Sequence, residues 1–441
     1  MKHPYMAAVL MLGLIAGLRL AGAEEGGEAQ PDKDIVLRHD NRAVPPNMIK
    51  RDDYLQVVPE RGPAIDAYLV KDILYANRDS NYDLGISKRD EGRYTVAALH
   101  FNRALAAMPN VKWAEEYCNY GMGAAMFDAG YYRGYTGRTG TVYSAPSVYF
   151  RNALKANPKS RFALEIYCKL PQCLAEEAFD NDGKLANAGK LDEADAAMKE
   201  AEKFLKTYKD ETIRLAAGFK PLADRAAALL AITDARVAEK RVAAGKETMN
   251  TVKDKWMSAS SSRTDAFPDL KGEAVDGLLQ TLVAMKDYTA AKAEADRLIN
   301  KFKRDGDQKM YPLLPGAYSV IGRSSFAQGV EQEGKNNKVQ ANAAYADARW
   351  AFLHVIAQFF DNDEYVASSH YYAGLCYDRL RDIESDAGEK AVRHWKLITV
   401  NFPKSRFAPE ASKELERVGA AAPAAAPAPA KKEDKPADTN K

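Results

Sequence analysis

The hydrophobic positions of the chain change their spacing near Pro63. Beyond that residue they recur three and four residues apart, in Ala-rich segments that Gly, Pro, Asn or Asp interrupts roughly every 12 to 20 residues. Apolar residues at this spacing lie on one face of an α-helix. The pattern therefore predicts a long succession of helices over residues 63–418, of which the last runs from Pro409 to Val418.

Before Pro63 the pattern is different. Ile35–Arg38 and Tyr54–Val58 are short runs of β-type residues, and the segment between them contains the Asn and Pro residues that are typical of turns. These runs predict a small β-hairpin or meander in an N-terminal arm over residues 24–62. An arm that lies extended against the first helices fits the same residues, and this alternative stays open.

The helical region contains an internal repeat that is clearest between Arg78 and Val111. Small, aromatic and turn-forming residues stand there in a fixed order: Leu84, Gly85, Gly92, Tyr94, Ala97, Phe101, Ala104 and Pro109. This pattern closely resembles the tetratricopeptide repeat, a unit of about 34 residues made of two antiparallel helices. The resemblance implies that Gly85 and Ala97 lie where the two helices cross closely, and that Tyr94 and Phe101 fill the space between them.

Weaker copies of the repeat follow, and one link between helices recurs without change. The six residues Pro158–Ala163 are identical to Pro403–Ala408, and each copy directly follows a predicted second helix. The link is similar to the variant of the repeat found in bacterial envelope proteins, such as the outer-membrane β-barrel assembly lipoprotein and the Tol-associated periplasmic coordinator. We therefore predict an all-α, tetratricopeptide-like superhelix of about seven helical pairs, with a small β-like N-terminal element and a disordered C-terminal tail.

Both ends of the chain have compositions that differ from the repeats. Residues 1–23 combine Lys2, an apolar run and small residues at Ala21 and Ala23, which predicts a cleavable signal peptide. Residues 419–441 are rich in Ala, Pro and Lys and cannot bury a core, so we expect a disordered tail there. The apolar run is too short for a membrane-spanning helix, so we expect no transmembrane segment after cleavage. The protein is expected to be exported, most plausibly to a periplasm, with peripheral attachment to an outer membrane left open.

Charge and cysteine content narrow the functional classes further. The 63 basic and 61 acidic residues nearly balance, which argues against a nucleic-acid partner held by bulk charge. The four cysteines are few for a disulfide-stabilised protein of this length. We interpret them as small buried thiols, while a disulfide among them is left open; they are Cys118, Cys168, Cys173 and Cys376.

The sequence contains no recognisable catalytic or cofactor-binding motif. The helix-borne His pair of zinc hydrolases is absent, and the spacings of His354, His370 and His394 match no zinc pattern. We therefore interpret these histidines as core or groove residues, and we expect neither a metal, nor a cofactor, nor an enzymatic activity.

The resemblance also suggests where a partner would bind. In stacked helical pairs the first helices line a concave groove, and residues on their exposed side are candidates for contact. These groove candidates are Tyr82, Arg89, Asn119, Met122, Tyr371 and Arg379. A second set lies in an insertion at residues 130–143, which mixes aromatic and basic residues: Tyr131, Arg133, Tyr135 and Arg138. The insertion could equally fold back over the edge of a repeat.

Two functions from different classes remain. The first is a scaffold that binds an exported or membrane protein of the envelope in its groove and supports the assembly or positioning of a complex. The second is a glycan-handling accessory that binds peptidoglycan or an exported polysaccharide through its aromatic residues. The sequence identifies neither the partner nor the oligomeric state.

Overall fold

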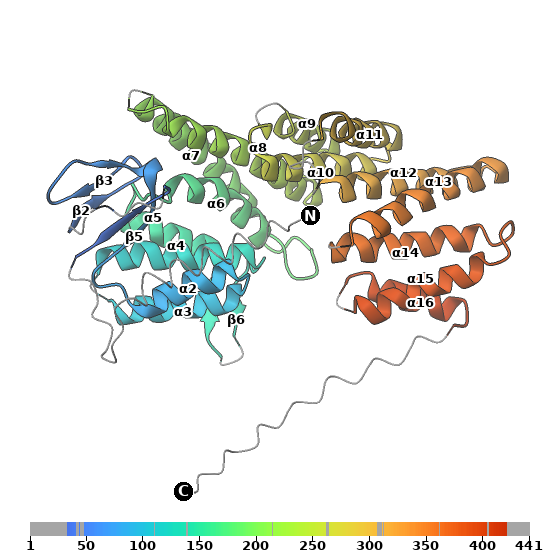
Figure 1. Ribbon diagram of the computed structural model, residues 1–441, viewed down its shortest axis with the longest axis horizontal. Coiled ribbons are helices and arrows are strands. Elements are labelled where there is room, and N and C mark those ends of the chain that lie inside the picture. Colours follow the sequence, from blue (N-terminus) through green and yellow to red (C-terminus); the bar gives the residue numbers. More distant parts are fainter. Residues whose placement is uncertain are drawn as a thin grey trace, which may run out of the picture. The chain divides into compact units, whose positions relative to one another are not determined.

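The computed structural model describes residues 33–40, 44, 48–109, 111–137, 140–213, 215–261, 264–306, 311, 313–360, 362–403 and 405–420 (Figure 1). The predicted signal peptide, Arg138 and residues 421–441 of the predicted tail lie outside these residues. Contacts within the chain divide it into unit 1, residues 1–226, and unit 2, residues 227–441.

Unit 1 begins with two small antiparallel sheets. Strand β1 (Ile35–Arg38) pairs with β5 (Val70–Leu74), and β3 (Gln56–Pro59) pairs with both β2 (Ile49–Asp52) and β4 (Ile65–Asp66). A 3-10 turn (Ala67–Leu69) joins β4 to β5. The Asp34 carboxylate ties the strands together, because it accepts hydrogen bonds from the backbone N–H groups of Ile49 (2.7 Å) and Ala76 (2.8 Å).

The predicted β-element is therefore present, but its predicted end at residue 62 is wrong. Strands β4 and β5 lie at residues 65–74, where we predicted helix. Val70 and Ile73 are buried in the core that the strands share with the first helices. The first α-helix begins only at Ser80, where the Asp79 carboxylate accepts a hydrogen bond from the Asn81 N–H (2.8 Å) and caps the helix.

The rest of unit 1 consists of helices packed in sequence order, from α2 to the start of α8. Their close approach depends on small residues: a Cβ atom at Gly85 or at Gly121 would lie 2.8 Å from the ring of Phe101. The helices are α2 (Ser80–Asp90), α3 (Tyr94–Ala107), α4 (Lys112–Asp128), α5 (Pro146–Ala156), α6 (Ala163–Glu177), α7 (Gly189–Thr212) and α8 (Phe219–Ala243), and α8 continues into unit 2.

Unit 2 repeats this architecture without a sheet among its described residues. Gly322 lies against the ring of Phe352, and Gly374 lies against Trp395, where added Cβ atoms would come within 2.6 Å and 2.4 Å of ring atoms. Its helices are α9 (Met249–Ala259), α10 (Pro268–Ala284), α11 (Tyr288–Asp305), α12 (Leu314–Gly334), α13 (Lys338–Gln358), α14 (Asp363–Arg379), α15 (Ala387–Asn401) and α16 (Ala408–Arg417).

The predicted fold class is confirmed: an all-α helical array with tetratricopeptide-like packing and a small β-element before it. Within the described residues, α2–α15 form seven consecutive pairs, and α16 follows them within one residue of the predicted final helix. The four cysteines are buried free thiols, in agreement with our interpretation. In the described part of the chain, no helix combines the length and apolar character that crossing a membrane requires.

Candidate functional site

A cavity of unit 2 lies on the face formed by the first helices of three successive pairs. It has a volume of about 480 Å³ and is bordered by α10, α12 and α14. Glycine makes room for it: a Cβ atom at Gly272 would lie 2.3 Å from the Leu313 side chain, and one at Gly316 would lie 3.0 Å from the Tyr365 hydroxyl. This location matches the groove that the tetratricopeptide resemblance implies, so we call it the groove cavity.

The groove cavity has both apolar and acidic lining residues. The apolar ones include Val275, Leu279 and Ala317, and the acidic ones are Asp269, Glu273 and Asp276. Side chains of this kind can enclose the aliphatic part of a partner residue and pair with a cationic end.

Two of the acidic groups, Asp276 and Glu273, have partners on other helices. The Asp276 carboxylate accepts hydrogen bonds from the Tyr365 hydroxyl (3.2 Å) and the Gln280 amide (3.3 Å). Burial and the adjacent Asp276 charge raise the pKa of Tyr365, so its hydroxyl stays a donor at neutral pH. Glu273 pairs with Arg236 of α8 at 2.6 Å.

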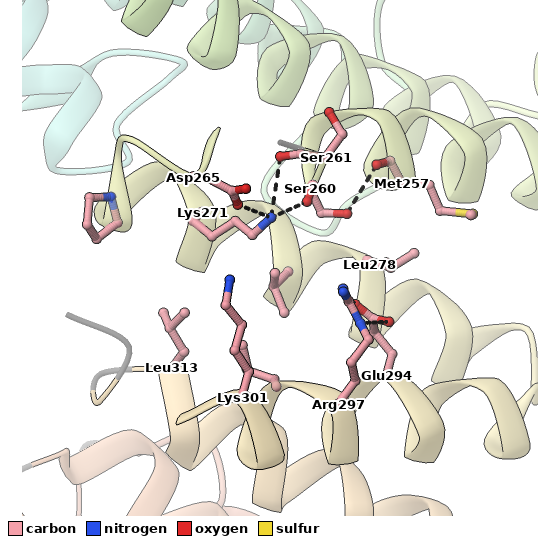
Figure 2. A pocket seen from close by; sticks show the side chains of 13 residues that line it. Met257, Ser260, Ser261, Asp265, Lys271, Leu278, Glu294, Arg297, Lys301 and Leu313 are labelled. Carbon is pink, nitrogen blue, oxygen red and sulfur yellow. Dashed lines mark hydrogen bonds and ion pairs between the residues drawn. The ribbon is translucent and has the colours of Figure 1, made fainter. Parts of the chain in front are cut away.

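A second pocket of about 370 Å³ lies between α9, α10 and α11 (Figure 2). Lys271 pairs with Asp265 (2.9 Å) and donates hydrogen bonds to the backbone carbonyls of Ser260 and Ser261, which follow the end of α9. Figure 2 shows Arg297 and Lys301 extending from α11 toward this pocket, and Arg297 pairs with Glu294. Because most of its charged groups bind one another, this pocket is the weaker candidate.

Three of the groove candidates are not available to a partner. Tyr82, Asn119 and Met122 are buried, so the prediction that they lie on an exposed side of their helices is wrong. The ring of Tyr82 contacts Trp113 and Tyr117, which in turn pack against Tyr75, just beyond β5. The core of these helices also includes Val70 and Ile73 of β5, which the repeat pattern alone does not indicate.

The other three groove candidates are partly accessible but already have neighbours. Arg89 in unit 1 pairs with Asp128 at 3.0 Å, and Arg379 in unit 2 pairs with Glu333 at 2.9 Å. Tyr371 is half-buried, with its ring 5.5 Å from that of Phe407. Their role in binding stays a prediction.

The insertion forms a short hairpin that folds back on its own unit. Strands β6 (Tyr135–Thr136) and β7 (Val142–Tyr143) pair, and the rings of Tyr131 and Tyr135 stack at 4.7 Å. Arg133 donates hydrogen bonds to the carbonyl of Phe179 (2.8 Å) and the side chain of Asn181 (3.0 Å), just beyond α6. This arrangement favours the fold-back alternative for Arg133. Tyr131 is exposed and Tyr135 is half-buried, so their role in binding stays a prediction, as does that of Arg138 outside the described residues.

A buried polar cluster joins the N-terminal strands to the helices. The hydroxyls of Tyr75 and Tyr117 donate hydrogen bonds to Asp52, and the Asn157 amide donates to Glu116 (2.9 Å) and to the Asp52 carbonyl (3.1 Å). Burial raises the pKa of Glu116 to about 7, and it also raises the pKa of Asp52. This cluster connects sheet and helices, and we assign it a structural role.

The histidines lie apart from both pockets. His370 and His394 face each other with their Nδ1 atoms 2.8 Å apart, and burial lowers the pKa of each to about 4. Within the described residues no group of three or more His, Cys, Asp or Glu side chains is placed to hold a metal ion.

Sequence reasoning missed the most exposed tryptophan, Trp350 of α13. The buried positions of this helix share one face and are Ala341, Tyr345, Ala348, Ala351, Phe352 and Val355. Trp350 falls outside that face, so the helical spacing itself contained the signal that its ring is not needed for packing.

Comparisons with known proteins do not establish a family for the chain. No family model and no curated protein matches the chain. Among solved structures, it is similar to an assembly chaperone of RpL4 (12% identity, TM-score 0.37, covering 70% of this chain and 98% of that chain). It is also similar to the human IFIT1 dimer with m7Gppp-AAAA (14% identity, TM-score 0.24, 77% and 82% covered) and to the TPR domain of P58(IPK) (12% identity, TM-score 0.17, 77% and 97% covered). At these values none of them assigns a function.

Proposed function

We propose that the chain is an exported, non-enzymatic scaffold that binds a partner protein in its groove and supports the assembly or positioning of a cell-envelope complex. The observation that carries this proposal is the groove cavity, which spans the first helices of three successive pairs. A surface built from several repeats can contact an extended stretch of a partner, and helical arrays generally bind in this way.

The chemistry of the groove cavity suggests what part of the partner enters it. The Asp276 carboxylate is held by Tyr365 and Gln280 in a cavity that apolar side chains also line. A lysine or arginine side chain of the partner fits this combination, since its methylene groups contact the apolar side chains while its charge reaches the carboxylate. The partner is expected to be an exported or membrane protein of the envelope, on the basis of the predicted signal peptide.

Export is tested separately from binding. We expect the mature protein to begin at Glu24 and to fractionate with the periplasm, either free or attached peripherally to the outer membrane. N-terminal sequencing of the purified protein and fractionation of the cells measure both. A protein that keeps residues 1–23, or stays in the cytoplasm, would contradict the export part of the proposal.

Binding is tested by a photo-crosslinking amino acid placed at the exposed rim position Asp269 of the full-length protein. We expect it to capture a discrete envelope protein in cells, and Asp276→Lys to abolish the capture because it reverses the charge in the cavity. Asp305→Lys is the matched control, since Asp305 is an exposed carboxylate of α11 that pairs with its neighbour Arg304. Folding of each variant is checked by circular dichroism. Capture that Asp276→Lys leaves unchanged would rule out the groove cavity as the binding site.

A further inference from the structure

An aromatic cluster lies on a surface of unit 2 that neither pocket includes. The His354 ring of α13 lies 4.2 Å from the ring of Tyr318 of α12 and 5.3 Å from the indole of Trp350, to which it is nearly parallel (18°). Phe359, just after α13, completes the cluster at 6.1 Å from both His354 and Tyr318. We call Tyr318, Trp350 and His354 the aromatic platform.

Trp350 is the exposed member of the platform. Its relative exposure is 59%, whereas Trp256 and Trp395 are 2% and 0% exposed. His354 covers part of the indole from one side, so the ring is held by stacking although it lies at the surface. Burial, with a smaller contribution from Lys303, lowers the pKa of His354, so its ring is neutral at pH 7 and can either donate or accept a hydrogen bond.

Polar side chains lie near each member of the aromatic platform. Asp347 is exposed and stands one turn before Trp350 on the same helix face, and Gln358 is exposed one turn beyond His354. Asp296 lies near Tyr318, and Lys303 lies near His354, close enough to influence their ionisation. The platform as a whole therefore has two carboxylates, an amide and an ammonium group in its vicinity.

This combination favours one class of ligand. A hydrophobic protein surface laid over Trp350 would remove water from these charged groups without replacing their hydrogen bonds, which is costly. A sugar ring is amphipathic: its C–H face packs against an aromatic ring, while the hydroxyls around its rim bond to carboxylates and amides. We propose that the aromatic platform is a saccharide-binding site in which one pyranose ring stacks on Trp350. This proposal concerns a surface other than the groove cavity and does not depend on the scaffold function.

Two sources could supply such a ring, the glycan strands of peptidoglycan and a neutral polysaccharide. They share the pyranose C–H face and differ in their N-acetyl groups. Chitotetraose and cellotetraose serve as soluble probes for the two, and purified peptidoglycan sacculi serve as the polymer. Binding is measured by isothermal titration calorimetry for the soluble probes and by co-sedimentation for the sacculi, with the full-length mature protein in each case.

We expect at least one probe to bind the wild type and to change the tryptophan fluorescence, because Trp350 is the most exposed of the four tryptophans. Trp350→Ala should weaken binding roughly tenfold, and Trp350→Phe, which keeps a smaller ring, should weaken it about threefold. Phe360→Ala is the matched control: this aromatic residue is 77% exposed just beyond the same helix, and its removal should change binding by less than about twofold.

The pattern of binding identifies the source of the sugar. Preference for chitotetraose and sacculi indicates peptidoglycan-type glycans, and preference for cellotetraose indicates a neutral polysaccharide. The proposal is overturned if none of the three probes binds, if Trp350→Ala binds like the wild type, or if Phe360→Ala weakens binding as much as Trp350→Ala does.

Discussion

The two identical six-residue links, Pro158–Ala163 in unit 1 and Pro403–Ala408 in unit 2, form the same turn in different surroundings. In both, the serine hydroxyl accepts a hydrogen bond from the N–H two residues later: the Phe162 N–H donates to Ser160 (3.0 Å), and the Phe407 N–H donates to Ser405 (3.3 Å). In both, the phenylalanine ring packs on a tyrosine of the preceding first helix. The local sequence therefore determines the turn.

The arginines of the two links show what the surroundings add. Arg161 donates hydrogen bonds to the strand carbonyls of Val70 (3.3 Å) and Lys71 (3.1 Å), and its charge lies near the buried Asp52. Arg406 pairs instead with Glu364 at 2.9 Å, with its side chain 76% exposed. The same residue thus connects a sheet to the helices in unit 1 and forms a surface ion pair in unit 2.

The largest expected effect tests this difference directly. Arg161→Met should destabilise unit 1 by about 3 to 5 kcal/mol, because it leaves the Asp52 carboxylate buried without its counter-charge. Arg406→Met, the matched substitution in the other link, should cost less than about 1 kcal/mol, since exposed ion pairs contribute little. Hydrogen exchange of peptides from α4 and from α14 reports on each unit separately. Equal costs in the two units would show that the sheet contact of Arg161 is not important.

The next comparison uses pH in unit 1. Burial holds the pKa of Glu116 near 7, above its ordinary value of 4.5, so between these values the folded state binds more protons than the unfolded state. Stability of unit 1 should therefore fall as pH rises from about 4.5 to 7, by roughly 3 kcal/mol in all. Urea unfolding of wild type and Glu116→Gln over this range measures the effect. If the stability of Glu116→Gln falls with pH as steeply as that of the wild type, the pH dependence comes from other groups.

In unit 2 the pH dependence of stability is expected to have the opposite sign. Burial lowers the pKa of His370 from 6.5 to about 4, and burial together with the charges of His370 and Arg393 lowers the pKa of His394 to about 4 as well. The unfolded state then binds more protons between pH 4 and 6.5, so stability of unit 2 should fall as pH drops through this window, by about 3 kcal/mol for each histidine. His394→Phe should reduce the pH dependence. Exchange rates of α14 and α15 peptides, corrected for intrinsic rates, provide the measurement, and pH-independent protection would contradict it.

The features that the sequence predicted well are local ones. The spacing of Gly85, Ala97 and Phe101 predicted a close helix crossing, and the crossing is present because only small residues fit against that ring. The final helix was predicted at 409–418 and is observed at 408–417. In each case residues near one another in sequence determine the structure.

The features that the sequence did not predict depend on contacts between distant residues. Strands β4 and β5 are two and five residues long, too short for a clear alternating pattern, and they are stabilised by pairing and by packing on α4. Tyr82, which the repeat pattern placed in a groove, is buried in the core that β5 shares with the first helices. The groove cavity depends on glycines of α10 and α12 that lie 44 positions apart, Gly272 and Gly316, and no local pattern marks them as one site.

The smallest expected effect comes from removing the serine hydroxyl of each link, which compares the same turn in two different surroundings. Ser160→Ala removes the hydrogen bond to the Phe162 N–H and a hydrogen bond to Glu116 from a buried position, so we expect a loss of about 2 kcal/mol. Ser405→Ala removes the equivalent bond to the Phe407 N–H and an exposed bond to Glu364 (3.1 Å), which water can replace, so we expect about 0.5 kcal/mol. Thermal unfolding of both variants gives the comparison. Equal losses would show that each serine contributes to stability only through its hydrogen bond within the turn. The sheet next to the first link would then add nothing to the contribution of Ser160.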